Sequence, residues 1–156
     1  MKVNKFLAVF LLIGVMASCN RNEVYFDYRT VSADGWSKDS LLVYNIDVKD
    51  SVSKFDIYVH VRHYGTYPYQ NLWMFIDYLD VKDSIPKHDT IECYLADEYG
   101  KWLGNGAGAL REMPVFIRQQ VQFPAVGEYQ ISIRHGMRDS LLTGINKIGV
   151  RVEKTQ

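Results

Sequence analysis

Short segments in which every second residue is apolar recur along this chain, and this pattern constrains the fold more than any other feature. In one of them Phe55, Ile57, Val59 and Val61 alternate with more polar residues. Such alternation predicts a β-strand that buries one face. About nine such segments occur, with turn residues roughly every ten positions between them: 24–28, 42–48, 55–61, 73–81, 89–96, 101–103, 115–123, 129–133 and 148–152.

Regular strands without crossover helices predict an all-β fold. We expect a single domain, an antiparallel β-sandwich of jelly-roll or immunoglobulin-like type, although periodicity does not give the strand order. Segment 73–81 is apolar on both faces near its start, which predicts a central strand with Trp73 buried. The expected core consists of Leu42, Ile46, Phe55, Ile57, Val59, Val61, Phe75, Ile91, Leu95, Ile117, Val121, Ile131, Ile133, Ile148 and Val150.

The stretch 89–108 predicts a strand, a tight turn, a second short strand and a glycine-rich corner. Gly100 ends the turn, because glycine readily adopts a positive φ. Gly104 and Gly106 then let the backbone bend or another group approach closely, so we assign all three glycines structural roles. A phosphate-binding loop is the weaker interpretation, since Pro114 prevents the long helix that such loops need.

The first nineteen residues have the features of an export signal. Lys2 and Lys5 precede an apolar run, 6–15, that is too short for a membrane-spanning helix of about 20 residues. Cys19 follows two small residues, which predicts a lipoprotein signal whose cleavage leaves Cys19 to carry lipid. Residue 16 is methionine where such signals usually have leucine, and the alternative is an ordinary signal peptide with Cys19 unmodified. We predict a signal peptide at 1–18, a lipidated tether at 19–23 and the β-sandwich domain at 24–156.

Charge and cysteine content exclude two classes of protein. Lysine plus arginine number 18, and aspartate plus glutamate also number 18. A balanced chain has no electrostatic field to attract nucleic acid, so we predict no nucleic-acid partner. The second cysteine, Cys93, alternates with apolar residues, so we expect it to pack in the core without a disulfide partner.

Side chains suited to metal binding are few and poorly spaced. His60 and His63 are three residues apart on a predicted strand and therefore point to opposite faces. Asp77, Asp80 and Asp83 could bind calcium through carboxylate oxygens, although they equally suit a solvated loop. We predict no metal and no cofactor, with calcium as the alternative.

Recognisable catalytic motifs are absent from the sequence. No G-x-S-x-G elbow occurs. Ser132, His135 and Asp139 are close along the chain, but a triad is defined by geometry. Asp97 and Glu98 are adjacent in a predicted turn, where carboxylates are usually solvated. We therefore predict no catalytic residue and no enzymatic activity.

Aromatic residues form 13% of the chain, and several gather in two predicted loops. Exposed rings on sandwich loops can bind sugars or anchor a protein partner, whereas the alternative is that they cap the core. We expect Tyr67, Tyr69 and Tyr99 to be exposed and to form the partner surface, with Trp102 at its edge.

Two segments, 95–97 (Leu-Ala-Asp) and 100–106 (Gly-Lys-Trp-Leu-Gly-Asn-Gly), resemble the signature of the gliding-motility lipoprotein GldH family. Segments 71–76 and 135–138 are similar to it as well, so the resemblance covers nearly the whole mature chain. It implies a non-enzymatic interaction component, attached to the membrane through lipid on Cys19. It also implies an envelope protein complex as partner, within the gliding-motility and linked protein-secretion machinery of Bacteroidota.

The alternative function is that of a carbohydrate-binding cell-envelope lipoprotein, which the fold class and the aromatic loops alone would favour. Segment 20–23 lacks the acidic cluster that resembles a surface-export signal in this phylum. We therefore expect a domain that faces the periplasm rather than the cell surface.

Overall fold

The computed structural model describes residues 22–80 and 86–155, and the predicted signal peptide and Cys19 lie outside this part of the chain. No helix in the described part is long and apolar enough to cross a membrane. The strands are β1 (Glu23–Thr30), β2 (Trp36–Ser37), β3 (Leu42–Val48), β4 (Phe55–Tyr64), β5 (Asn71–Asp80), β6 (Lys87–Tyr94), β7 (Leu110–Val121), β8 (Gly127–His135), β9 (Leu141–Leu142) and β10 (Ile145–Lys154).

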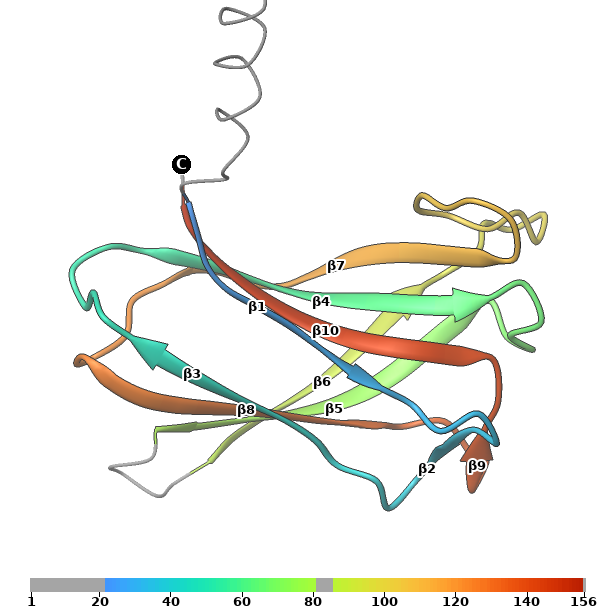
Figure 1. The fold of residues 1–156 in the computed structure, drawn as a ribbon, viewed down its shortest axis with the longest axis horizontal. Coiled ribbons are helices and arrows are strands. Elements are labelled where there is room, and N and C mark those ends of the chain that lie inside the picture. The colour runs from blue at the N-terminus through green and yellow to red at the C-terminus, as the bar shows by residue number, and fades with distance from the viewer. Residues whose placement is uncertain (1–21, 81–85, 156) are drawn as a thin grey trace, which may run out of the picture.

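Two four-stranded sheets lie one above the other (Figure 1). One has the order β1-β10-β4-β7 and the other β3-β8-β5-β6, while β2 and β9 form a small separate pair. Every pairing is antiparallel. The all-β antiparallel sandwich predicted from the alternation is therefore confirmed.

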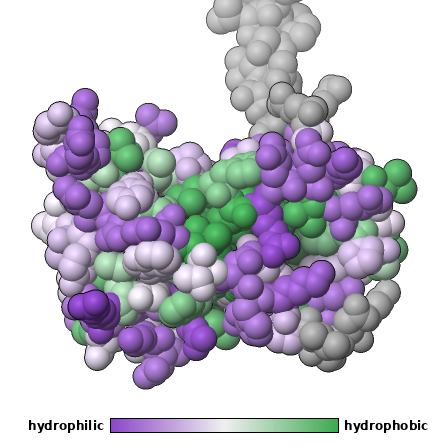
Figure 2. Space-filling model, turned by 180° about the vertical axis from the view of Figure 1, so that it is seen from behind, coloured by the Kyte–Doolittle hydropathy of each residue, from purple (hydrophilic) through white to green (hydrophobic). Residues whose placement is uncertain are grey.

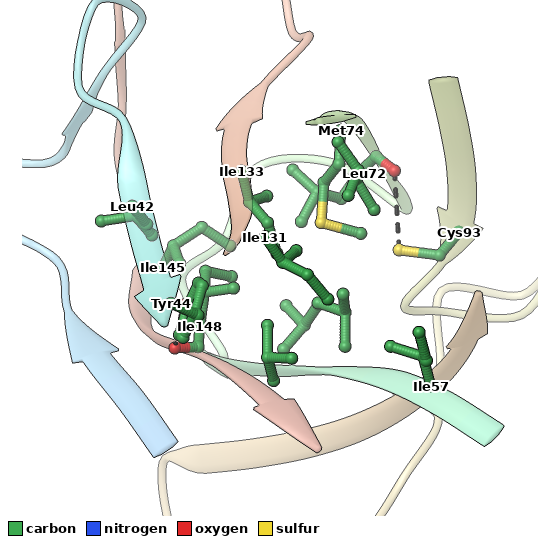
Figure 3. Close-up of a cluster of buried hydrophobic side chains, with 14 of the residues drawn as sticks. Leu42, Tyr44, Ile57, Leu72, Met74, Cys93, Ile131, Ile133, Ile145 and Ile148 are labelled. Atoms are coloured by element: carbon green, nitrogen blue, oxygen red, sulfur yellow. Dashed lines mark hydrogen bonds between the residues drawn. The ribbon is translucent and has the colours of Figure 1, made fainter. Parts of the chain in front are cut away.

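Apolar side chains from the inner faces of both sheets meet in one core (Figure 3). Tyr44 on β3 crosses this core and donates its hydroxyl hydrogen to the carbonyl oxygen of Ile148 on β10, at 2.7 Å. Cys93 is buried as expected, and its thiol lies 3.5 Å from the carbonyl oxygen of Leu72. Burial raises the pKa of this thiol to about 12, so Cys93 behaves as a small apolar side chain.

The core differs from the prediction on strand β5, where the wrong face was assigned to it. Leu72, Met74 and Ile76 are fully buried, whereas Phe75 is half-buried under Arg134 and Trp73 is 38% exposed. Both faces of this strand are apolar, so alternation alone does not fix which face points inward.

Three other residues expected in the core are only half-buried. Ile91 lies on β6, and Ile117 and Val121 lie on β7, and all three pack against the core without being enclosed by it. Both strands are the edges of their sheets on one side of the sandwich. Their exposure follows from this position, which periodicity does not reveal.

The two ends of the sandwich differ in what they carry (Figure 1). At one end β1 begins beside the end of β10, and the amide of Lys154 donates to the carbonyl oxygen of Asn22 at 2.7 Å. The loops 65–70, 95–109 and 136–140 gather at the other end. We call these the proximal and distal ends, because the chain enters the domain at the first of them.

The glycine corner belongs to the distal end. Gly100 has a φ of +80°, as the predicted turn requires. The expected second strand at 101–103 is wrong, because these residues contribute a single bridge between Trp102 and Ala96. Beyond it, the amides of Asn105 and Glu112 each donate to the other's carbonyl oxygen, at 3.0 and 2.7 Å, which folds the corner back onto the start of β7.

We expect Gly104→Val and Gly106→Val each to lower the free energy of unfolding by about 1–3 kcal/mol. A Cβ at Gly104, whose φ is +75°, would lie 2.9 Å from the carbonyl carbon of Glu112. One at Gly106 would lie 3.0 Å from Cα of Arg111. Urea unfolding measures both changes.

Gly108→Asn is the matched control. Gly108 also has a positive φ, +62°, but a Cβ there meets no atom within 4 Å, and asparagine tolerates this conformation. If Val at 104 and 106 were as harmless as Asn at 108, close backbone approach would not be the role of these glycines.

Candidate functional site

Tyr67 is the clearest error among the predicted surface residues, because it is buried with 3% of its area exposed. Its hydroxyl donates to the carbonyl oxygen of Asn71 at 2.8 Å, and burial raises its pKa. Its ring packs near His63 and Trp102, with centroid distances of 5.9 and 6.5 Å. Trp102 is itself half-buried, 4.7 Å from the His63 ring. These rings cap the distal end of the core.

Other aromatic side chains at the distal end do reach solvent. Tyr69 is 37% and Tyr99 87% exposed, and Trp73, which was expected inside, is 38% exposed. Tyr69 and Trp73 line one groove of about 340 Å³, together with Asn71, Gly136, Met137 and Arg138. The Tyr69 hydroxyl donates to a carboxylate oxygen of Asp139 at 2.7 Å, which fixes one wall of this groove.

A second feature is the carboxylate of Glu112, on the outer face of the sheet that contains β1, β4 and β7. Tyr28 donates its hydroxyl hydrogen to Oε1 at 2.5 Å, and His60 Nδ1 lies 2.9 Å from the same oxygen. The Arg62 guanidinium donates to Oε2 through Nε at 3.0 Å and Nη2 at 2.5 Å. We call Glu112, Tyr28, His60 and Arg62 the Glu112 cluster.

The charge state of the Glu112 cluster follows from these contacts. Burial alone would raise the pKa of Glu112, but hydrogen bonds from Tyr28, Arg62 and His60 outweigh it and lower the pKa to about 2. Burial lowers the pKa of His60, which favours the neutral imidazole. Nδ1 is the donor in the contact with Glu112, because an ionised carboxylate can only accept hydrogen bonds. No local sequence pattern predicts this cluster, since its members lie up to 84 residues apart.

Among the residues that the structure describes, those considered for metal binding and catalysis are engaged in separate contacts. His60 lies on the outer face of its strand against Phe26, and His63 points to the core, so their opposite orientation is confirmed. No group of three or more His, Cys, Asp or Glu side chains in 22–80 and 86–155 could hold a metal. Asp77 instead contacts His88 Nδ1 at 2.6 Å, and Asp83 lies outside the described residues.

The three residues considered as a triad are engaged separately. His135 Nε2 lies 3.0 Å from the carbonyl oxygen of Trp36, and Asp139 accepts the hydrogen bond from Tyr69. Ser132 is buried in β8, where it pairs with Val43. Ser132 and His135 are three residues apart on β8 and therefore point to opposite faces of the sheet, so the serine and the histidine do not form a nucleophile and base pair.

The family model described as GldH lipoprotein matches residues 23–152. The chain belongs to this family. A GldH homolog from Christiangramia forsetii is 31% identical over 96% of this chain and 94% of its own length. The gliding motility lipoprotein GldH of Flavobacterium johnsoniae is 29% identical over 94% of both chains. This GldH-family chain is accordingly a lipoprotein of the cell envelope.

Solved structures resemble the GldH-family chain only weakly. A family GH115 4-O-methyl-α-glucuronidase aligns with 88% of this chain and 18% of its own, at a TM-score of 0.42 and 12% identity. An exo-β-1,3-galactanase from Phanerochaete chrysosporium aligns at a TM-score of 0.37 and 12% identity, over 83% and 27% of the two chains. At these values the likeness supports no statement about function.

We expect Glu112→Gln to lower the free energy of unfolding by about 1–3 kcal/mol at pH 6, because it weakens three charge-assisted contacts. The pKa of Glu112 is about 2 when folded and ordinarily 4.5. This stabilisation is therefore complete above about pH 4.5 and disappears as the pH falls through 2. Urea unfolding at pH 6, at pH 4 and near pH 2 should show the difference from the unsubstituted protein shrinking.

Glu98→Gln provides the control, because Glu98 is exposed in the 97–100 turn and should change stability little at any of these pH values. A Glu112→Gln difference that stays constant down to pH 2 would mean that packing of the side chain, and not its charge, supports the cluster.

Proposed function

We propose that this protein is a non-enzymatic docking component, lipid-anchored through Cys19, of the gliding-motility and linked protein-secretion machinery. The observation that carries the proposal is the GldH family match over 23–152, with relatives that are named for gliding motility. The domain faces the periplasm in this proposal, since segment 20–23 lacks an acidic cluster. No catalytic role is assigned to any residue.

The short tether defines how the domain stands on the membrane. Two residues, 20 and 21, separate Cys19 from Asn22, and the three Cα–Cα steps between them span roughly 11 Å at most. The proximal end therefore lies close to the bilayer surface when Cys19 is acylated. The distal end lies at the opposite ends of the strands (Figure 1). In this proposal it is therefore presented away from the membrane.

The distal end is the docking surface in this proposal, with Tyr69, Trp73 and Tyr99 as its anchors. Exposed apolar area costs roughly 25 cal/mol per Å² in lost burial, so several exposed rings at one end of the domain suggest a partner that covers them. Tyrosine and tryptophan dominate binding energy at protein interfaces and lose little rotamer freedom there. Rings alone would also suit a sugar, and the family relationship is what favours a protein partner.

Cys19→Ala should abolish membrane attachment, because no other lipid site is proposed for this chain. Fractionation of cells that express the variant, together with incorporation of a labelled fatty acid, measures this. Continued membrane association with label uptake would contradict the assignment of Cys19. Protease digestion of intact cells tests the orientation, and rapid loss of the unsubstituted protein would place it on the surface.

The combined change of Tyr69, Trp73 and Tyr99 to Ala should leave the fold intact and reduce co-purification with envelope proteins at least tenfold, as expected when hot-spot residues are removed. Phe116→Ala is the matched control, since Phe116 is also an exposed ring but lies on the outer face of β7. Quantitative mass spectrometry after mild crosslinking gives the measurement.

Tyr67→Ala separates binding from folding. Because Tyr67 is buried, its loss should cost about 3–5 kcal/mol in stability. Unchanged co-purification of the folded triple variant would show that the partner binds elsewhere, and retention of a polysaccharide by the distal rings would favour the carbohydrate alternative.

A further inference from the structure

A cavity of about 410 Å³ opens between the two sheets near the proximal end. Most of its wall is apolar, with Ile46, Ile57, Val121, Phe123 and Ile131 among the lining residues. Its size and composition match those of small-molecule sites in proteins, which are mainly apolar with a few placed polar groups. Gln122 in its wall bonds to Ser51 in the neighbouring loop, at the end where the chain enters the domain.

The cavity exists because the sandwich is open on the side of β6 and β7. Figure 2 shows this side, where hydrophobic surface lies between hydrophilic rims and is interrupted by a hydrophilic strip. Arg118 on β7 crosses to Asp89 on β6, donating to its Oδ2 through Nε at 3.0 Å and Nη2 at 2.7 Å. This ion pair spans the opening between the sheets.

Two polar side chains in the cavity wall, Lys87 and Tyr78, are available to bind a ligand. Lys87 is exposed and forms no ion pair with any residue in the described part of the chain. The Tyr78 hydroxyl is buried, and no side chain of the described residues makes a well-formed hydrogen bond to it. Arg118 and Asp89 are its charged neighbours, and the Arg118 guanidinium lies 4.4 Å from the Tyr78 ring centroid. Both residues line the cavity.

Lys87 and Tyr78 are direct partners in the β5–β6 ladder. Directly opposed residues of antiparallel strands project from the same face with Cβ atoms about 5 Å apart. Lys87 and Tyr78 therefore project from the same face of the sheet, and each contributes a polar group to the cavity wall. Asp80 also lines the cavity, but its side chain is not free, because it interacts with another group. The charge of Asp89 is balanced by its ion pair with Arg118. The pair of Lys87 and Tyr78 thus favours an anionic oxygen ligand.

A strand from a partner is the obvious other occupant of an open sandwich side, but the edge is protected against it. Lys87 and Asp89 follow the inward phase of Ile91 and Cys93 on β6, so charged side chains point into the opening. Inward charges on an edge strand block the addition of another strand, because they would be buried without water. A single flexible hydrocarbon chain can enter the cavity without burying these charges, so it does not incur this free-energy cost.

We infer that this cavity binds a long-chain fatty acid. Its hydrocarbon chain lies among Ile57, Val121, Phe123 and Ile131, and its carboxylate meets the Lys87 ammonium and the Tyr78 hydroxyl. The apolar wall supplies the hydrophobic free energy, and the charge-assisted contacts select an acid over an alcohol. The membrane that anchors the chain supplies such ligands at the same end of the domain. The inference stands apart from docking at the distal end.

A photoreactive palmitate analogue tests the inference on the full-length protein in its native membrane. After illumination and digestion, label should appear on the tryptic peptide 119–134, which contains Val121, Phe123 and Ile131. Excess palmitate should displace it, and hexadecanol should compete poorly. Lys87→Glu should reduce labelling at least about threefold. Ile131→Trp, which fills the cavity, should reduce it further.

Lys49→Glu is the matched control, because Lys49 is an exposed lysine near the proximal end that pairs with Asp47 and does not line the cavity. Absence of label on 119–134 would overturn the inference, as would labelling equal in the Lys87→Glu, Ile131→Trp and unsubstituted proteins. Equal competition by hexadecanol would exclude recognition of the carboxylate. The Cys19→Ala variant, which lacks the proposed lipid, is labelled in parallel. Label on this variant but not on the unsubstituted protein would overturn the binding of a free fatty acid, because the protein's own acyl chain would then fill the cavity.

Discussion

The whole domain depends on burying one apolar face of each sheet against the other. Inner residues such as Val59, Ile133 and Val150 are inaccessible to water, and together these faces form a single core. Tyr44 adds a directional contact, because its hydroxyl bonds to the backbone of the opposite sheet. The hydrophobic term holds the sheets together, and this bond favours one alignment of them. The loops at both ends take their positions from this alignment.

Local alternation in the sequence predicted which residues of most strands face inward. It did not predict features that depend on how the strands are arranged in space. Strands β3, β4, β8 and β10 have one apolar face, so their inward residues were identified correctly. Strand β5 is apolar on both faces, and the prediction therefore chose the wrong face as the one that points into the core. The half-exposure of Ile91 and Ile117 follows from edge positions that are set by strand order, which periodicity does not contain.

The candidate sites show the same division. The spacing of the glycines predicted the corner at 104–106, because the need for a residue without a Cβ atom is visible in the local sequence. Tyr67 was misplaced because a tyrosine in a loop next to proline has no local sign that the end of the core lies beneath it. The Glu112 cluster joins three strands of one sheet and the proximal cavity joins both sheets, so neither could be recognised before the sheets were assembled.

The pairing of the first and last strands has a mechanical consequence. β1 begins at the proximal end and runs toward the distal end, bonded along its length to β10. A pull between a lipid anchor and a partner at the distal end would act along β1. The hydrogen bonds of an antiparallel pair are perpendicular to the strands, so such a load shears many of them together rather than opening them one after another. The topology thus suits a protein that transmits tension between two structures of the envelope.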